Sequence, residues 1–311
     1  MRIASLLPSA TEMVCALGLT ERLVGVSHEC DYPPVVRGLP KVTNTLIPNQ
    51  ASSTVIDRMV RERLRTSQPL YSLDASALQR LRPDLVVTQS LCNVCAVAED
   101  DVRAAVRTLA STPQVVNLET RSLSQVLAAM WKLGRAADIE QQTERVVDRL
   151  TDRIQAVATG TAAIRHRPRV TLLEWLDPPF SCGHWNPELV QLAGGVEGLG
   201  QEGQPSRTLR WDEVVEWQPE VIFIACCGFG VERTMEDIPK LQCIDGWHSL
   251  PAVRSERVFV ADGSQYFNRP GPRLVDSLEI LAHVLHPEVH PLTAGLPAPI
   301  RVCRRAPVNQ H

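Results

Sequence analysis

The chain has 311 residues, of which 44% are hydrophobic and 22% charged, and its formal net charge is −3. This length allows two domains with a core each, and the composition is typical of an ordinary soluble globular protein. The weak net charge and the lack of a dense basic cluster exclude nucleic acid as an expected partner. No apolar run is long enough for a membrane span.

The first residues predict a strand and not a leader sequence. Met1 and Arg2 lead directly into the apolar segment 3–7, without a basic leader, a long apolar stretch and a small-residue cleavage site. The nine cysteines are an odd number and too sparse for a disulfide scaffold. We therefore expect a cytoplasmic location, whereas a misassigned start would favour the periplasm.

Residues 1–121 are predicted to form an N-terminal α/β lobe. Strands are expected at 3–7, 23–27, 85–88 and 114–117, with helices at 10–17, 74–81 and 97–109. Apolar strands separated by helices indicate a parallel sheet that is covered on both faces. The polar stretch from about 43 to 70 is expected to be an irregular insertion with one helix at 55–64.

A helical stretch at 122–165 follows, and it is expected to bridge two lobes. Its apolar residues recur every three or four positions, which is typical of one buried helix face. Ser122 is a candidate N-cap, and Gly134 with residues 135–137 is a candidate joint between a short helix and a longer one. A helix from about 138 to 159 would extend roughly 30 Å, enough to cross from one domain to the other.

Residues 166–287 are predicted to form a C-terminal α/β lobe. The segment 78–87 resembles the segment 214–223, since each reads as a helix, a proline turn and a buried strand. This internal similarity supports two lobes of the same kind. The tail at 288–311 holds several prolines and basic residues, and we expect it to be loosely ordered.

Cysteine and histidine residues follow several predicted strands, where open parallel sheets bind their ligands. If the two sheets turn these ends toward each other, the residues line one cleft. The candidate metal ligands are His28, Cys30, Cys92, Cys95, Cys182, His184 and Cys226. Cys92 and Cys95 have the CxxC spacing of zinc or iron sites, and a His/Cys pair can complete four ligands. Two alternatives stay open, namely a redox pair and simple packing of small thiols.

Aromatic residues also gather in the predicted loops at these strand ends. They are Tyr32, Trp175, Phe180, Trp185, Phe229, Tyr266 and Phe267. Core packing explains any one of them, but a group of loop aromatics is typical of the wall of a pocket for a large planar or apolar ligand.

The sequence does not favour an enzyme. It contains no GxxxxGK[ST], GxSxG or HExxH motif, and Ser9 and Ser181 have no evident His/Asp partners. Glu174 and Asp177 have the chemistry of an acid and a base. A carboxylate at a strand end, however, is more often a cap or a hydrogen-bond acceptor for a ligand.

Several motifs resemble those of a known family. The segments SLLPSATE (5–12), LVGVS (23–27), DYPP (31–34) and RPDLV (82–86) resemble the cobalamin- and siderophore-binding proteins of ABC importers, above all the vitamin B12-binding type. The segments DPPF (177–180), GG (194–195) and RPGPR (269–273) extend the resemblance to about residue 287. In combination these motifs are fairly specific for the fold.

The resemblance implies an α/β fold of the class III periplasmic-binding-protein type, with two Rossmann-like lobes and parallel sheets bridged by a long helix. It also implies that a corrinoid, or a related tetrapyrrole or metal chelate, binds in the cleft between the lobes. The implied contacts are Tyr32, Trp175, Phe180, Tyr266, Phe267 and Arg269. Arg269 would donate hydrogen bonds to an amide or phosphate group of the ligand.

The chain departs from this family pattern at three points. The export signal is missing, and Cys92, Cys95 and Cys226 have no counterpart in the family. The glutamate that docks onto the permease aligns with Ser76 in the first lobe and with Asp212 or Glu213 in the second. These departures predict a cytoplasmic relative that binds a similar ligand without feeding a transporter, with a thiolate or imidazole approaching the cobalt.

Two other functions remain as alternatives. One is a transition-metal or redox protein that uses the Cys/His cluster, with zinc or iron as the metal. The other is an enzyme that acts on a corrinoid.

Overall fold

The structure is a computed structural model that describes residues 1–48, 51–66, 68–89, 99–107, 109 and 112–302. Tertiary contacts divide the chain into two units. Unit 1 comprises residues 1–151 and 270–272, and unit 2 comprises residues 152–269 and 273–311. The boundary falls inside helix α6 (Glu140–Ala162), so one continuous helix contributes to both units.

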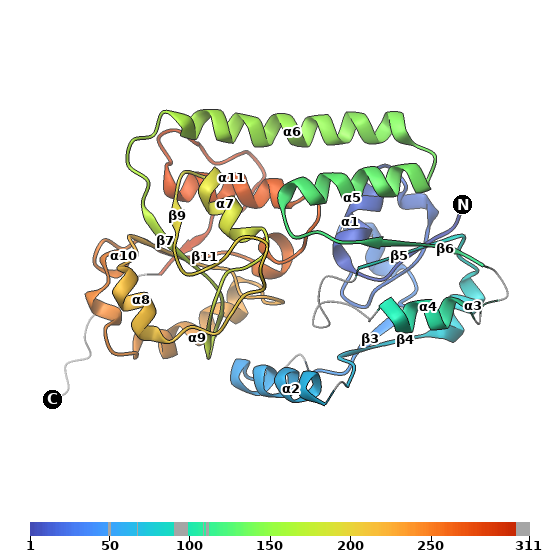
Figure 1. Cartoon of the computed structure of the whole chain (residues 1–311), viewed down its shortest axis with the longest axis horizontal. Coiled ribbons are helices and arrows are strands. Elements are labelled where there is room, and N and C mark those ends of the chain that lie inside the picture. Colours follow the sequence, from blue (N-terminus) through green and yellow to red (C-terminus); the bar gives the residue numbers. More distant parts are fainter. Residues whose placement is uncertain (49–50, 67, 90–98, 108, 110–111, 303–311) are drawn as a thin grey trace. The chain divides into compact units, whose positions relative to one another are not determined.

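Unit 1 is built on a parallel sheet of four strands in the order β2-β1-β5-β6. These strands are β1 (Ile3–Ser5), β2 (Leu23–Val26), β5 (Leu85–Gln89) and β6 (Gln114–Leu118). Helices α1 (Pro8–Ala16) and α5 (Leu123–Ala136) lie on one side of the sheet, and α3 (Ala75–Leu81) and α4 (Glu99–Arg107) lie on the other (Figure 1). The predicted parallel α/β architecture is thus confirmed in this unit.

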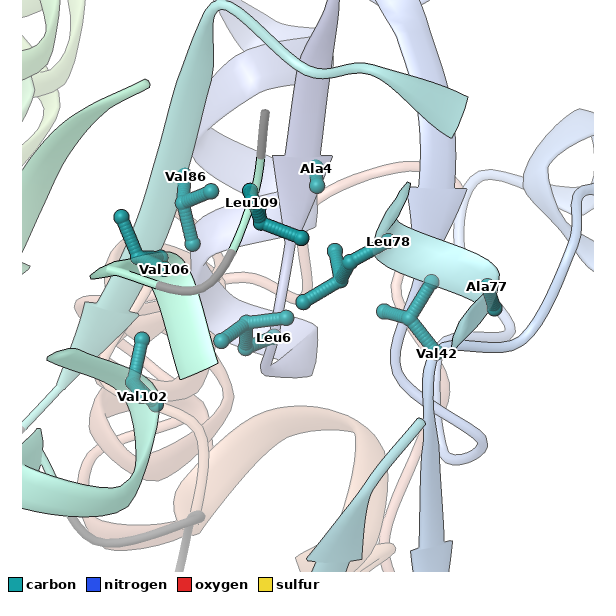
Figure 2. Packing of buried hydrophobic residues seen from close by; sticks show 9 residues of the cluster. All are labelled: Ala4, Leu6, Val42, Ala77, Leu78, Val86, Val102, Val106 and Leu109. Carbon is teal, nitrogen blue, oxygen red and sulfur yellow. The ribbon is translucent and has the colours of Figure 1, made fainter. Parts of the chain in front are cut away.

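One layer of the unit 1 core shows why these segments adopt their structures (Figure 2). Ala4 and Leu6 are two positions apart, and so they face the same side of the sheet. They belong to a buried cluster with Leu78 of α3 and Val102 of α4. The other members are Val42, Ala77, Val86, Val106 and Leu109. Full burial of each large aliphatic side chain stabilises the fold by roughly 1.5–3 kcal/mol, which outweighs the weak propensities of such short elements.

The segment 43–70 is more regular than expected. Strand β3 (Thr43–Thr45) pairs antiparallel with β4 (Tyr71–Leu73), and helix α2 (Ser53–Arg65) lies between them in sequence. The sequence predicted the helix but not the two strands. Each strand has three residues, which is too short for an alternating pattern to stand out.

Helices α5 and α6 confirm the predicted N-cap, and α5 ends within the predicted joint at 134–137. Ser122 Oγ accepts a hydrogen bond from the Gln125 backbone N–H at 3.2 Å. Helix α5 continues through Gly134, and the break follows at 137–139, where Asp138 has a φ of 53°. A Cβ atom on Gly134 would collide with Thr143 Oγ1 of α6. Gly134 therefore permits close packing of two helices and does not separate them.

Unit 2 contains a mixed sheet of six strands in the order β12-β11-β10-β7-β8, with β9 also paired to β7. Its parallel part consists of β7 (Arg169–Leu176), β10 (Val221–Ile224) and β11 (Val258–Val260), as predicted, and of the short β9 (Val196–Glu197), where only a turn was expected. The antiparallel strands are β8 (Pro179–Ser181) and β12 (Ile300–Arg301). The helices are α7 (Asn186–Leu192), α8 (Trp211–Trp217), α9 (Val231–Gln242), α10 (Pro251–Arg254) and α11 (Leu274–Leu285).

Strand β12 lies in the segment that was expected to be loosely ordered. Arg301 is the register partner of Phe259 on β11, and Val302 is buried. The prolines of this tail suggested an irregular chain, but two residues suffice to extend the edge of an existing sheet. The end of the described chain is therefore part of unit 2.

Helix α6 is held separately in each unit. In unit 1, Gln142 Nε2 donates to the Leu17 carbonyl oxygen at 2.8 Å. In unit 2, Arg153 pairs with Asp276 at 2.6 Å and with Glu279 at 2.8 Å, both on α11. Within the described ranges, no helix combines the length and the apolar character that a membrane crossing requires.

Candidate ligand-binding site

In unit 1, the loop that follows β2 carries three of the predicted site residues. Tyr32 precedes a cis peptide bond to Pro33, and its side chain is 43% exposed. The side chains of His28 and Cys30 contact threonine hydroxyl groups of unit 1. His28 Nδ1 lies 2.8 Å from Thr43 Oγ1, whereas Cys30 Sγ is buried 3.0 Å from Thr11 Oγ1. The loop thus presents one aromatic side chain to solvent and keeps the thiol inside.

His28 lies in an environment that favours a neutral imidazole. Its ring contacts the Tyr71 ring at a centroid distance of 5.6 Å. Partial burial lowers the pKa of His28 below its usual value, and the nearby Lys41 charge lowers this pKa further. Nε2 of this ring is buried without a hydrogen-bond partner among the described residues. The lowered pKa favours the neutral imidazole, although both ring nitrogens are enclosed, since Nδ1 faces Thr43 and Nε2 is buried 3.8 Å from Glu29 Oε1.

In unit 2, an aromatic stack lies at the carboxyl end of the sheet. The rings of Trp175 and Phe229 pack at a centroid distance of 4.7 Å, and the Arg233 guanidinium lies 4.4 Å above the Phe229 ring. Trp175 is the register partner of Phe180 on β8. The turn between β7 and β8 contains the cis bond between Asp177 and Pro178. This arrangement places the partly exposed rings of Trp175 and Phe180 beside a fixed positive charge, while Phe229 is buried.

Two carboxylates hold the positive charges of this stack in position. Asp237 accepts from Arg233 at 3.0 Å and pairs with Lys240 at 3.1 Å, and all three residues lie on α9. Lys240 also pairs with Asp177 in the β7–β8 turn at 3.0 Å. The turn is therefore tied to α9. Arg233 was not among the predicted contacts, because no helix was predicted at 231–242. The four-residue spacing of Arg233 and Asp237 is typical of an ion pair on a helix.

Phe267 and Trp185 have structural positions, contrary to their prediction as ligand contacts. Phe267 is fully buried and packs against Phe223 of β10 at 4.9 Å. Trp185 is 5% exposed, and its Nε1 donates to the Phe267 carbonyl oxygen at 2.8 Å. Both rings fill the interior of unit 2 because their loops fold back over the sheet. Neither ring is exposed enough to contact a ligand.

Tyr266 and Arg269 remain near the edge of the same loop. Tyr266 lies in the turn η4 (Gly263–Phe267), and the Arg273 guanidinium lies 5.2 Å from its ring. Arg269 is 8% exposed, and its Nη2 lies 3.4 Å from Ser264 Oγ. A Cβ atom on Gly263 would collide with the Cys226 carbonyl oxygen. Glycine at this position allows the loop to pack onto the strand that ends before Cys226.

The predicted metal ligands do not converge in the part of the chain that the structure describes. Within this part, no group of three or more His, Cys, Asp or Glu side chains has the geometry of a metal site. Cys92 and Cys95 lie outside the described residues. Cys226 is buried, which raises the pKa of its thiol to about 12. The structure therefore does not support a metal centre at His28, Cys30, Cys182, His184 and Cys226.

Cys182 lies in a buried acidic environment. Burial raises the pKa of this thiol well above its usual value, and the neighbouring Glu197 and Glu174 raise it further. The Glu197 carboxylate accepts from the backbone N–H groups of Leu172, Leu199 and Gly200. A protonated thiol is a poor metal ligand and a poor nucleophile. His184 stacks on Trp185 at 5.6 Å and is likewise a packing residue.

The two positions expected to face a permease differ in their surroundings. Ser76 Oγ donates to Asp74 Oδ1 at 2.7 Å and accepts from Arg80 at 3.1 Å. Asp212 is exposed in the first turn of α8. Its neighbour Glu213 pairs with Arg207 at 2.8 Å and caps the helix. Of the two aligned acids in unit 2, Asp212 is thus the more accessible.

Comparison with known proteins places this geometry in a family. Residues 3–264 match the family model described as periplasmic binding protein. The chain belongs to the periplasmic binding protein family. This periplasmic binding protein is a substrate-binding protein of the ABC-importer type, and the resemblance seen in the motifs is confirmed. The members are transport components without catalytic activity, which agrees with the expectation that the chain is not an enzyme.

Individual relatives support the same conclusion. The vitamin B12-binding protein of Vibrio cholerae is 24% identical over 288 residues, covering 89% of this chain and 86% of the relative. An ABC transporter substrate-binding lipoprotein of Bacillus subtilis, named as uncharacterized, is 24% identical over 295 residues, covering 92% of this chain and 80% of the relative.

Solved structures show the same fold. A periplasmic heme-binding protein from Pseudomonas aeruginosa has a TM-score of 0.73 at 19% identity and covers 98% of this chain and 99% of its own. The periplasmic vitamin B12-binding protein of Vibrio cholerae has a TM-score of 0.66 at 24% identity, and the match covers 91% of this chain and 96% of the neighbour. These neighbours confirm the class III fold with two α/β units. Their names refer to the periplasm, so the predicted cytoplasmic location of this chain stays a prediction.

Proposed function

We propose that this protein binds a corrinoid or a related tetrapyrrole through the loops at the carboxyl ends of its two sheets. The observation that carries the proposal is the stack of Trp175, Phe229 and Arg233 in unit 2. Its partly exposed indole offers a flat apolar surface, and its guanidinium is a donor for amide, carboxylate or phosphate groups at the rim of a large ligand. In unit 1, the exposed Tyr32 offers a second aromatic surface.

The names of the relatives support this class of ligand. They are described as binding vitamin B12 or heme, and both are broad, flat metal-containing macrocycles. The contacts that remain candidates are Tyr32, Trp175, Phe180, Phe229, Tyr266 and Arg269, together with Arg233. His28 is a candidate axial ligand, because its lowered pKa favours the neutral imidazole. No observation among the described residues favours the alternative of a zinc, iron or redox protein.

Titration of the purified protein with cyanocobalamin, hydroxocobalamin and haem, followed by calorimetry and visible spectra, tests this proposal. Trp175→Ala is expected to weaken binding about tenfold or more, because truncation of a central aromatic contact costs roughly 2 kcal/mol. Trp131→Ala removes an indole from helix α5 and serves as the matched control. Circular dichroism should show that both variants are folded.

Two results would contradict the proposal. One is the absence of binding to all three ligands by the unmodified, folded protein. The other is an equal loss of affinity in the Trp175 and Trp131 variants, which would mean that any large truncation perturbs the fold.

A further inference from the structure

Unit 2 has an open hollow of about 710 Å³ at the edge of the sheet that is opposite to the aromatic stack. Its lining includes Pro168 and Arg257, which directly precede β7 and β11. Parallel strands begin at the same edge, so the hollow lies at the amino ends of the strands and the stack lies at their carboxyl ends. Other lining residues come from the end of α6 and from the segment 284–289 that includes the end of α11. The hollow is therefore separate from the proposed tetrapyrrole site.

Positive charge dominates this hollow. Its lining contains the arginines Arg165, Arg257 and Arg301, whereas Glu288 is the only acidic residue among the lining residues of the described chain. Arg165 and Arg301 are exposed at its rim. The register of β12 on β11 fixes Arg301 beside Phe259, with the guanidinium 5.6 Å from the ring. Arginines held at defined positions around a concave surface are typical of sites for carboxylate or phosphate groups.

Arg257 is the central residue of this arrangement. Its Nη2 donates to the carbonyl oxygens of Leu285 at 3.0 Å and Val284 at 3.4 Å, which orients the guanidinium against the end of α11. No described carboxylate pairs with it, and no described residue accepts from its Nε or Nη1. Burial lowers the pKa of Arg257, the charges of Glu220 and Glu288 raise it, and the Arg301 charge lowers it. A half-buried cation that is not directly paired with a carboxylate is costly, and a bound anion would reduce that cost.

We propose that this hollow is a binding site for a small oxyanion with two or more negative charges, which Arg257 and Arg301 would hold through its phosphate or carboxylate oxygens. Arg257 supplies the oriented donors Nε and Nη1. Arg301 and Arg165 supply charge at the rim, and Glu288 limits the affinity by repulsion. The site does not depend on the identity of the ligand at the aromatic stack.

The test is calorimetric titration of the full-length protein with inorganic phosphate and with citrate, at low and constant ionic strength. Arg301→Gln is expected to weaken binding about threefold, and Arg257→Gln about tenfold or more, because a donor in a partly buried site contributes more than an exposed one. Glu288→Gln is expected to tighten binding about twofold, since it removes a repulsive charge. Arg149→Gln, an exposed arginine of α6 in unit 1, is the matched control and should not change the affinity.

Arg301 is exposed, so Arg301→Gln remains informative even if Arg257→Gln does not fold. Preference for phosphate over citrate, or the reverse, distinguishes the two kinds of oxyanion. Absence of heat with both anions, or equal affinities for Arg301→Gln, Glu288→Gln and the unmodified protein, would overturn the proposal.

Discussion

At the scale of single residues, burial determines which of the chemically reactive side chains can act. Glu174 is the clearest case, since it lies on β7 directly before Trp175. Its Oε1 accepts from the Gly183 N–H at 3.0 Å and from Asn186 Nδ2 at 2.8 Å. Burial nevertheless raises the pKa of Glu174 to about 7, and the charge of Glu197 contributes to this rise. The two donors make Glu174 a structural acceptor that organises the loop after β8.

This carboxyl group should make the stability of the protein depend on pH. Its pKa is higher in the folded state than in the unfolded state, so the folded state binds more protons, and the free energy of unfolding falls as the pH rises from about 4.5 to 7. Glu174→Gln stays neutral. Its free energy of unfolding relative to the unmodified protein should rise by up to about 3 kcal/mol between pH 5 and pH 8.

Urea unfolding at both pH values measures this difference. Glu197, whose pKa is also raised by burial, leaves part of the pH dependence in the variant. An offset between variant and unmodified protein that is the same at pH 5 and pH 8 would show that Glu174 does not titrate in this range.

At the scale of secondary structure elements, the contact between α5 and α6 depends on a single glycine, Gly134. Gly134 is a weak helix former, and from sequence it predicts a break. In the structure it allows Thr143 to approach the α5 backbone, while Thr143 Oγ1 donates to the Ile139 carbonyl oxygen at 3.1 Å. The low helix propensity of glycine is thus outweighed here by its packing against α6.

Gly134→Ala should destabilise unit 1 by about 1–2 kcal/mol, because overpacking outweighs the gain in helix propensity of about 1 kcal/mol. Thermal and urea unfolding measure the change. Thr143→Ala in the same chain should recover part of the loss, because it removes the colliding atoms. Gly38→Ala is the matched control, because a Cβ atom at Gly38 meets no other atom within 4 Å. A neutral or stabilising effect of Gly134→Ala would refute this interpretation.

At the scale of the whole molecule, the two units share helix α6. The contact boundary lies between Thr151 and Asp152, in the middle of α6. Arg153 lies two residues after Thr151. Its guanidinium pairs with Asp276 and Glu279 of α11 and so ties α6 to unit 2. The second half of α6 depends on this ion pair for its position on α11.

Arg153→Gln should therefore lower stability by about 1–2 kcal/mol, and the effect should be confined to unit 2. Hydrogen exchange should show faster exchange in α11 and in the second half of α6, with no change in β1 and β5 of unit 1. Arg149→Gln, one helical turn earlier, serves as the control. Equal loss of protection in both units, or none in α11, would contradict this account.

Much of the architecture was predictable from local sequence patterns. The parallel strands of both units except β9, the Ser122 N-cap and the helix at 211–217 all agree with the structure, because apolar periodicity and capping chemistry depend on near neighbours. The strands β3, β4, β8, β9 and β12 were missed, since each has only two or three residues. Such short strands form only because another strand is already in place to pair with them.

The sequence by itself determined that this is an α/β protein with two similar sheets and that its aromatic and thiol side chains follow the strands. Only the tertiary structure decided which of them meet solvent. Trp175 lies near the end of β7 and Phe267 lies in η4 after β11, yet Trp175 is partly exposed beside Phe229, while Phe267 is buried against Phe223. Cys182 faces two carboxylates that no spacing rule connects to it. The solvent exposure of a side chain and the charges around it depend on residues that folding brings close, whereas the apolar periodicity of a strand or helix depends only on neighbours in the chain.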